Sequence, residues 1–194
     1  MTANAILGAA CSQFAEKGFE GASLAGIARA VGIKKQSIAT YFAKKEDLFL
    51  AAFHEMARHY YEFLERLYTE FRDIPVEIRL REIVYKNYYY RMEQPVLTAF
   101  YKMAVQFPPP FFRDVLGEQI ALMEQQSAGL YRSIFEEGMR AGVIRQQQAD
   151  SLLSAYYCLL DGIAMQMFFY SQEKFEQRLG DIWGIFWAGI KQPE

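Results

Sequence analysis

A short polar segment after Gly32 carries the side chains of this sequence that are best suited to chemistry with another molecule. Its members are Lys34, Lys35, Gln36, Ser37 and Thr40. A lysine ammonium binds phosphate or the acceptor edge of guanine, and the amide of a glutamine pairs with adenine. These residue types, gathered over seven positions, suit either a contact with double-stranded DNA or a helix face that meets only solvent.

Two short helices are predicted to position this segment. Ser23 is a suitable N-cap for the first helix, whose apolar face contains Leu24, Ile27, Ala28 and Val31, and Gly32 ends it. The second helix is predicted over residues 34–42, with Ile38, Tyr41 and Phe42 facing inward. This layout is typical of a helix-turn-helix, in which one helix braces across the DNA backbone and the next enters the major groove.

The remainder of the chain also has helical periodicity, and alternating strand patterns are not found. Helices are predicted over residues 4–17, 45–69, 76–93, 96–107, 112–140, 147–170 and 173–190, with breaks at Pro95, at the three prolines 108–110 and at Gly142. The predicted fold class is therefore all-α: a three-helix head followed by a helical bundle, with about nine helices in total.

The N-terminal quarter of the sequence resembles the tetracycline-repressor (TetR) family of bacterial regulators. The matching residues are Phe14-Ala15-Glu16-Lys17-Gly18-Phe19, Ser23, Ile27-Ala28, Val31-Gly32-Ile33, Tyr41-Phe42 and Lys45-Glu46-Asp47-Leu48. The sequence departs from the family pattern at Ala39, where an aromatic is frequent, and at Gln36, where a small residue is common. No arginine precedes Ile6, which removes one expected contact with the DNA backbone.

The resemblance implies a DNA-binding domain over residues 1–47 and a domain for ligand binding and dimerisation over residues 48–194. It implies a homodimeric repressor that leaves a pseudo-palindromic operator when a small effector binds. It also implies that an aromatic and a lysine at the end of the motif hold phosphates. The predicted DNA-binding residues are Ser23, Lys34, Lys35, Gln36, Ser37, Thr40, Tyr41 and Lys45.

Aromatic side chains are dense between residues 85 and 112. They are interpreted either as a packed helical core or as the wall of an apolar effector pocket. The candidate pocket residues are Tyr89, Met92, Phe100, Met103, Phe107, Met123, Asp161 and Met165. The composition favours a hydrophobic effector, such as a fatty-acyl compound or an aromatic drug-like molecule. Asp161 or Glu93 would suit a cationic drug, whereas Arg91 or Lys102 would suit an acyl-coenzyme A.

The last two helices are apolar around most of their circumference, which predicts burial against both their own domain and a second subunit. Paired about a two-fold axis, they would form a four-helix interface. The candidate interface residues are Leu152, Tyr156, Leu160, Ile163, Met167, Leu179, Trp183, Phe186 and Ile190. The segment 152–170 is nearly long enough to cross a bilayer, but Ser154, Asp161 and Gln166 argue against a membrane span.

Other classes of function find little support in the sequence. It has no visible phosphate loop, nucleophile elbow or catalytic carboxylate pair, so we expect neither an enzyme nor a cofactor. His54 and His59 are one residue too far apart to share a metal on a helix face, and the two cysteines are too distant for a zinc site. The cysteine usage and the absence of a signal sequence predict a cytoplasmic protein. The alternative function is a hydrophobic-ligand-binding helical module without a DNA role.

Overall fold

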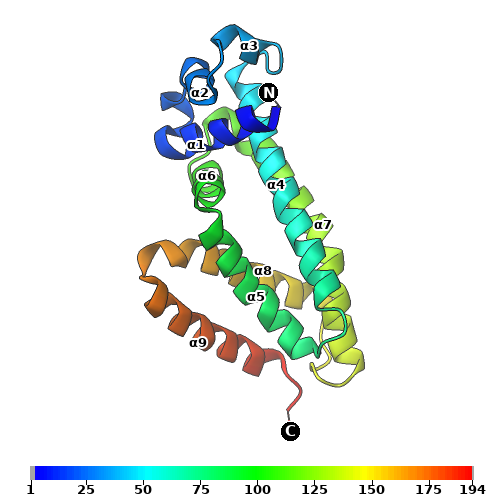
Figure 1. Ribbon diagram of the computed structural model, residues 1–194. Helices are drawn as coiled ribbons and strands as arrows, with labels where there is room; N and C mark the ends of the chain where they lie inside the picture. The colour runs from blue at the N-terminus through cyan, green and yellow to red at the C-terminus, as the bar shows by residue number, and fades with distance from the viewer. Residues whose placement is uncertain (1–2, 194) are drawn as a thin grey trace. The chain divides into compact units, whose positions relative to one another are not determined.

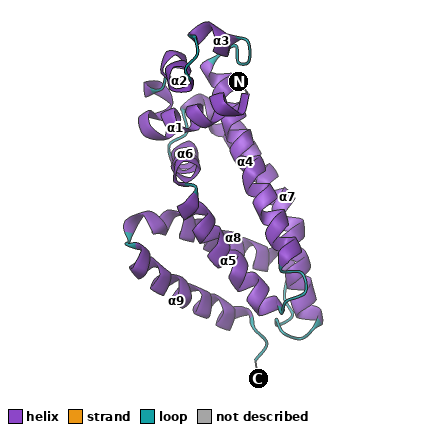
Figure 2. Ribbon diagram, viewed as in Figure 1, coloured by secondary structure: helices purple, strands orange, loops and turns teal. Residues whose placement is uncertain are grey.

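The computed structural model describes residues 3–193, and Met1, Thr2 and Glu194 lie outside the described residues. The helices are α1 (Ala3–Gly21), α2 (Leu24–Val31), α3 (Lys35–Ala39), α4 (Lys45–Glu70), α5 (Val76–Glu93), α6 (Pro95–Gln106), η1 (Pro110–Phe112), α7 (Arg113–Arg140), α8 (Ala149–Gln166), η2 (Met167–Phe169) and α9 (Gln172–Ile190). Over this range there is no β-strand (Figure 2), only an isolated bridge between Ile144 and Lys191. The all-α prediction is confirmed.

The observed helix boundaries follow the local signals in the sequence. Ser23 is the N-cap of α2, where its Oγ accepts a hydrogen bond from the Gly26 N–H at 3.1 Å. Gly32 and Gly142 have φ of 75° and 69°, the left-handed conformation that ends a helix and that glycine adopts without strain. The recognition segment is shorter than predicted, because α3 ends at Ala39 and the chain then turns through Thr40 and Tyr41.

The chain forms two compact units, which we describe separately. Unit 1 contains the residues up to Tyr61 and Gln94–Met123, and unit 2 contains Glu62–Glu93 and the residues from Glu124 onward. Both α4 and α7 run from one unit into the other. The predicted boundary between residues 47 and 48 separates a DNA-binding domain from a ligand-binding domain, whereas the two units are defined by packing, so this boundary stays a prediction.

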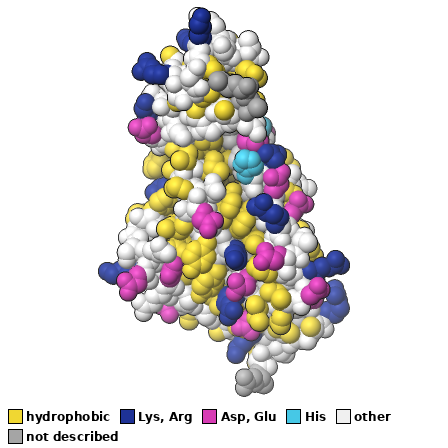
Figure 3. All heavy atoms as spheres, viewed as in Figure 1, with side chains coloured by type: hydrophobic (Ala, Val, Ile, Leu, Met, Phe, Trp, Pro, Cys, Tyr) yellow, Lys and Arg dark blue, Asp and Glu magenta, His cyan; other side chains and the backbone are white. Residues whose placement is uncertain are grey.

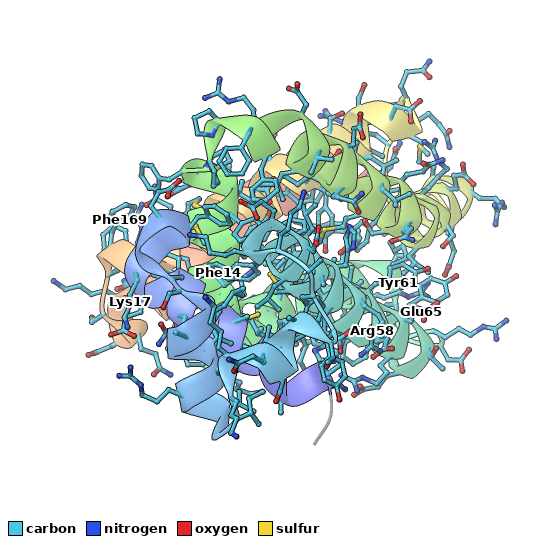
Figure 4. All side chains as sticks on the ribbon, turned by 90° about the horizontal axis from the view of Figure 1, so that it is seen from above. Phe14, Lys17, Arg58, Tyr61, Glu65 and Phe169 are labelled. Carbon is cyan, nitrogen blue, oxygen red and sulfur yellow. The ribbon has the colours of Figure 1, made fainter. Side chains whose placement is uncertain are left out.

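Unit 1 is built on the packing of α1 against α2 and α6 (Figure 1). A cluster of phenylalanines fills its core, and Phe14, which points into the unit in Figure 4, lies 5.0 Å from Phe49 and 6.0 Å from Phe100 between ring centroids. Lys17, one helical turn further along α1, is exposed. Phe100 belongs to α6, so a helix distant in the sequence completes the core of the N-terminal helices.

In unit 2, α5 packs against both α8 and α9. Arg79 of α5 is a buried cation whose guanidinium donates to the Glu137 carboxylate of α7 at 2.8 and 3.1 Å. The same group donates to the carbonyls of Arg72 and Ile74 in the turn after α4. One side chain therefore ties the turn between α4 and α5 to α7.

The segment Ala149–Phe169 is the one helical stretch among the described residues that is long and apolar enough to cross a membrane by length and composition. Only 33% of its most apolar window is buried inside the protomer. A single helix of this kind is weak support for a membrane span, because the core helix of a soluble protein meets the same criteria.

Candidate nucleic-acid interface

The turn between α2 and α3 brings the predicted DNA-contacting side chains onto one end of unit 1. The Gly32 N–H donates back to the Ala28 and Arg29 carbonyls, which closes α2, and Lys34 is the N-cap residue of α3. Ile27 and Ile38 are fully buried and hold the two helices to the core. Burial of these two side chains fixes the direction in which the opposite face of α3 projects.

Most of the predicted DNA-contacting residues are available to a ligand. Lys34, Lys35, Gln36 and Thr40 are exposed, Ser37 is half-buried, and Tyr41 keeps 52% of its surface exposed. Thr40 Oγ1 already donates to the Ser37 carbonyl at 2.8 Å, so its methyl and its oxygen lone pairs remain for another partner. Figure 3 shows Lys and Arg side chains projecting from the end of unit 1 that carries α2 and α3.

Two further basic residues extend this surface. Arg29 in the last turn of α2 and Lys44 before α4 are both exposed. Their charge was visible in the sequence, but only the position of the α2–α3 turn shows that they flank the recognition segment. A cationic surface of this kind attracts the phosphate backbone without selecting a sequence.

Two members of the predicted set have local partners. The hydroxyl of Ser23 caps α2 as described above, which is a structural task. The Lys45 ammonium is half-buried and donates to the carbonyls of Phe19 at 2.7 Å and Ala22 at 3.2 Å. Its role as a phosphate contact stays a prediction, and the two hydrogen bonds favour a role inside unit 1.

The structure does not gather the candidate effector residues within one unit. Phe100, Met103, Phe107 and Met123 belong to unit 1, and Tyr89, Met92, Asp161 and Met165 belong to unit 2. Phe100 is fully buried and has no surface to offer a ligand, whereas Phe107 is 73% exposed. An open depression of about 570 Å³ on α4 is lined by Glu62, Glu65, Arg66, Thr69 and Glu70, and this polar lining does not suit an apolar effector. Figure 4 shows Glu65 on the same helix as Arg58 and Tyr61.

Asp161 is the charged member of the candidate pocket set. Desolvation raises the pKa of its carboxyl, and the positive charge of Arg91 opposes part of that rise. Asp161 as a whole residue is exposed, and its carboxylate is within the electrostatic influence of Arg91.

Nearly all candidate dimer residues are buried within the protomer itself. Eight of them, namely Leu152, Tyr156, Leu160, Ile163, Met167, Leu179, Trp183 and Ile190, are buried, and Phe186 is half-buried. The opposite face of the same helices is exposed and carries small residues, the carboxylates of Asp161 and Asp181, and Ile185, which is 79% exposed. A second subunit on α8 and α9 would therefore meet this outer face.

The glutamate, histidine and cysteine side chains outside the predicted sites differ in their surroundings. Glu55 accepts from Arg58, which lowers the pKa of the Glu55 carboxyl, and His59 Nε2 lies 3.2 Å from Glu55. Burial raises the pKa of the Cys11 thiol to about 12, so this thiol is unreactive, whereas Cys158 is exposed. No group of three or more His, Cys, Asp and Glu side chains that could hold a metal occurs in residues 3–193.

The N-terminal helices match a known protein family. Residues 6–52 match the family model described as "Bacterial regulatory proteins, tetR family". These residues include α2, α3 and the first turns of α4, so the matched segment contains the whole candidate interface. Comparison with curated proteins gives no significant match.

Solved structures share the fold over the full chain. The regulator FadR from Bacillus subtilis in complex with stearoyl-CoA has a TM-score of 0.80 at 18% identity, covering 97% of this chain and 100% of that chain. A TetR transcription regulator from Haloarcula marismortui has a TM-score of 0.79 at 15% identity, covering 97% of each chain. The fatty acid degradation regulator FadR from Bacillus halodurans has a TM-score of 0.75 at 18% identity, covering 94% of this chain and 93% of that one. At these identities the likeness establishes the fold.

Proposed function

We propose that this chain, whose residues 6–52 match the tetR family model, is a homodimeric repressor that binds operator DNA through α3 and is released by a hydrophobic effector. The observation that carries this proposal is that the recognition segment is exposed while the apolar side chains that anchor α2 and α3 are buried in the core. Lys34, Lys35 and Gln36 project outward while Ile27 and Ile38 are fully buried. The residues that would touch DNA are thereby separated from those that hold the fold.

A dimer accounts for the exposed outer face of α8 and α9. This outer face includes Ala155, Cys158, Asp161, Gly162, Asp181, Gly184, Ile185 and Ala188. Small side chains allow two helices to approach closely, and a two-fold axis would present the same face from each subunit. Such a dimer would place two recognition helices about 34–36 Å apart, one turn of the DNA helix, on a pseudo-palindromic operator.

The effector is proposed to be a hydrophobic molecule, with a long-chain acyl-CoA as the first compound to test. The B. subtilis protein of the same fold is described in complex with stearoyl-CoA. The sequence also supplies the apolar and aromatic side chains that such a tail needs. Because coupling between two sites is reciprocal, operator DNA should weaken effector binding by the factor by which effector weakens DNA binding.

Fluorescence anisotropy with DNA duplexes tests the proposal. A duplex selected by the protein from a random-sequence pool should bind more tightly than the unselected pool, and its affinity should fall steeply as salt rises. Stearoyl-CoA should release the duplex, whereas coenzyme A alone should not. Salt-dependent DNA binding without a selected sequence would contradict the operator role. Ligand binding without any DNA binding would support the helical ligand-binding module instead.

A further inference from the structure

The lysine at the start of α4 is held by its own chain. Lys45 Nζ donates to two carbonyls near the end of α1, those of Phe19 and Ala22, and lies 4.2 Å from the centroid of the Phe19 ring. The two hydrogen bonds carry a full positive charge, which makes them stronger than neutral ones, and the ring face adds a cation–π contact. To reach a phosphate, Lys45 would have to give up this arrangement.

The other lysines of the same region differ from Lys45 in this respect. Lys34, Lys35 and Lys44 are exposed, whereas Lys45 is half-buried. An exposed lysine can move toward the phosphate backbone at little cost in free energy, because it does not have to break hydrogen bonds within the protein first. The sequence does not distinguish these four lysines, but the ammonium group of Lys45 is the one among them that binds carbonyls of unit 1.

Phe19 connects Lys45 to the segment that follows α6. The Phe19 ring lies 5.4 Å from both Phe111 and Phe112, in edge-to-face geometry, and 5.4 Å from Phe49. Edge-to-face pairs of this kind have a preferred orientation, so they resist rotation of one ring against the other. A displacement of η1 would therefore change the position of Phe19 and of the carbonyl that Lys45 holds.

We propose that Lys45 is a positioning residue and not a phosphate contact: with Phe19 it links η1 to the first turn of α4, and so sets the orientation of α3. The inference rests on the proposed DNA-binding function. The chain between α3 and α4 is five residues long, and the Lys44 N–H donates to the Asp47 carboxylate at 3.1 Å, which fixes the start of α4. With this short connection, the first turn of α4 determines where α3 can lie.

The salt dependence of DNA binding distinguishes positioning from phosphate contact. A dimer that loses one phosphate contact per subunit should show a salt slope smaller by about 1.8, because each contact contributes about 0.9. For Lys45→Met we expect an unchanged slope, about ten-fold weaker binding to the selected duplex, and unchanged binding to the unselected pool. Lys35→Met, an exposed lysine with the same substitution, should instead reduce the slope and weaken binding to both DNAs.

Each result has a separate consequence. A slope that falls by about 1.8 in Lys45→Met, as for a phosphate ligand, would overturn the inference and leave the proposed function intact. Equal loss of affinity for selected and unselected DNA would overturn it as well, since misplacement of α3 should affect the selected sequence. If the wild-type protein shows no preference for the selected duplex, the proposed operator binding itself fails. Thermal unfolding of each variant confirms that the assay temperature lies below its melting transition.

A second pair of variants tests the link from η1 without touching Lys45. Phe107 and Phe111 are both exposed aromatics of the segment after α6, at 73% and 58%, but only Phe111 of the two has ring contacts with Phe19 and Phe112. We expect Phe111→Ala to weaken binding to the selected duplex several-fold, and Phe107→Ala to leave it within about two-fold. Equal affinities of the two variants would overturn the proposed route through Phe19.

Discussion

Replacement of Ile185 by lysine tests the proposed dimer directly. Ile185 is the most exposed large apolar side chain of α9, at 79%, and lies on the outer face that the protomer does not use. In a two-fold interface this side chain would be buried in both subunits. A lysine there would remove two apolar contacts and place two ammonium groups inside the interface, where burial of a charge costs free energy.

The size of the effect follows from the exposed surface. Complete burial of an isoleucine side chain contributes about 1.5–3 kcal/mol, so two largely exposed copies contribute about 3–5 kcal/mol to the dimer. At about 1.4 kcal/mol for each factor of ten, the dimer dissociation constant should rise between roughly 100-fold and several thousand-fold. Binding to a two-half-site operator should weaken in parallel, because each half-site would have to recruit a subunit separately.

Sedimentation equilibrium measures the dissociation constant, and the exposed thiol on the same face gives a second readout. Cys158 should react slowly with a thiol reagent in the dimer and rapidly in Ile185→Lys, while the buried Cys11 stays unreactive in both. The matched control is Ile78→Lys, since Ile78 is a 38% exposed isoleucine on α5. An unchanged dissociation constant in Ile185→Lys, or equal effects of the two substitutions, would refute the assignment of this face.

Three further predictions concern unit 2. Arg79→Met should lower the free energy of unfolding by about 3 kcal/mol, measured in urea, because it removes a buried cation that satisfies two carbonyls and Glu137. Gly138→Ala should cost about 1–3 kcal/mol by overpacking, since the added Cβ would lie 2.6 Å from Ile144 Cδ1, and Ile144→Val should recover part of the loss. Asp161→Asn should raise the melting temperature near pH 7. The raised pKa of the Asp161 carboxyl means that its ionisation destabilises the folded protein as the pH rises above the ordinary pKa of an aspartate, and asparagine cannot ionise. The gain in melting temperature should therefore shrink as the pH is lowered toward the ordinary pKa. A gain that is independent of pH would contradict the last prediction.

Local signals explain why the helices could be placed from the sequence. Ser23 and Gly32 are the end signals of α2, and both act as expected: one caps with its hydroxyl and the other adopts a positive φ. These interactions span only a few residues, so the surrounding fold has little influence on them. The same holds for the break at residues 108–110, where proline removes the N–H that a helix needs.

The sequence by itself determined the all-α class, the helix-turn-helix and its outward polar residues, because periodicity and caps act over one or two turns. Only the tertiary structure decided which apolar face of α9 meets its own chain, placing Trp183 inside and Ile185 outside. Periodicity cannot make this choice when both faces are apolar. The structure likewise decided that Lys45 turns toward Phe19, since a charge in a sequence does not reveal which carbonyls will lie beside it.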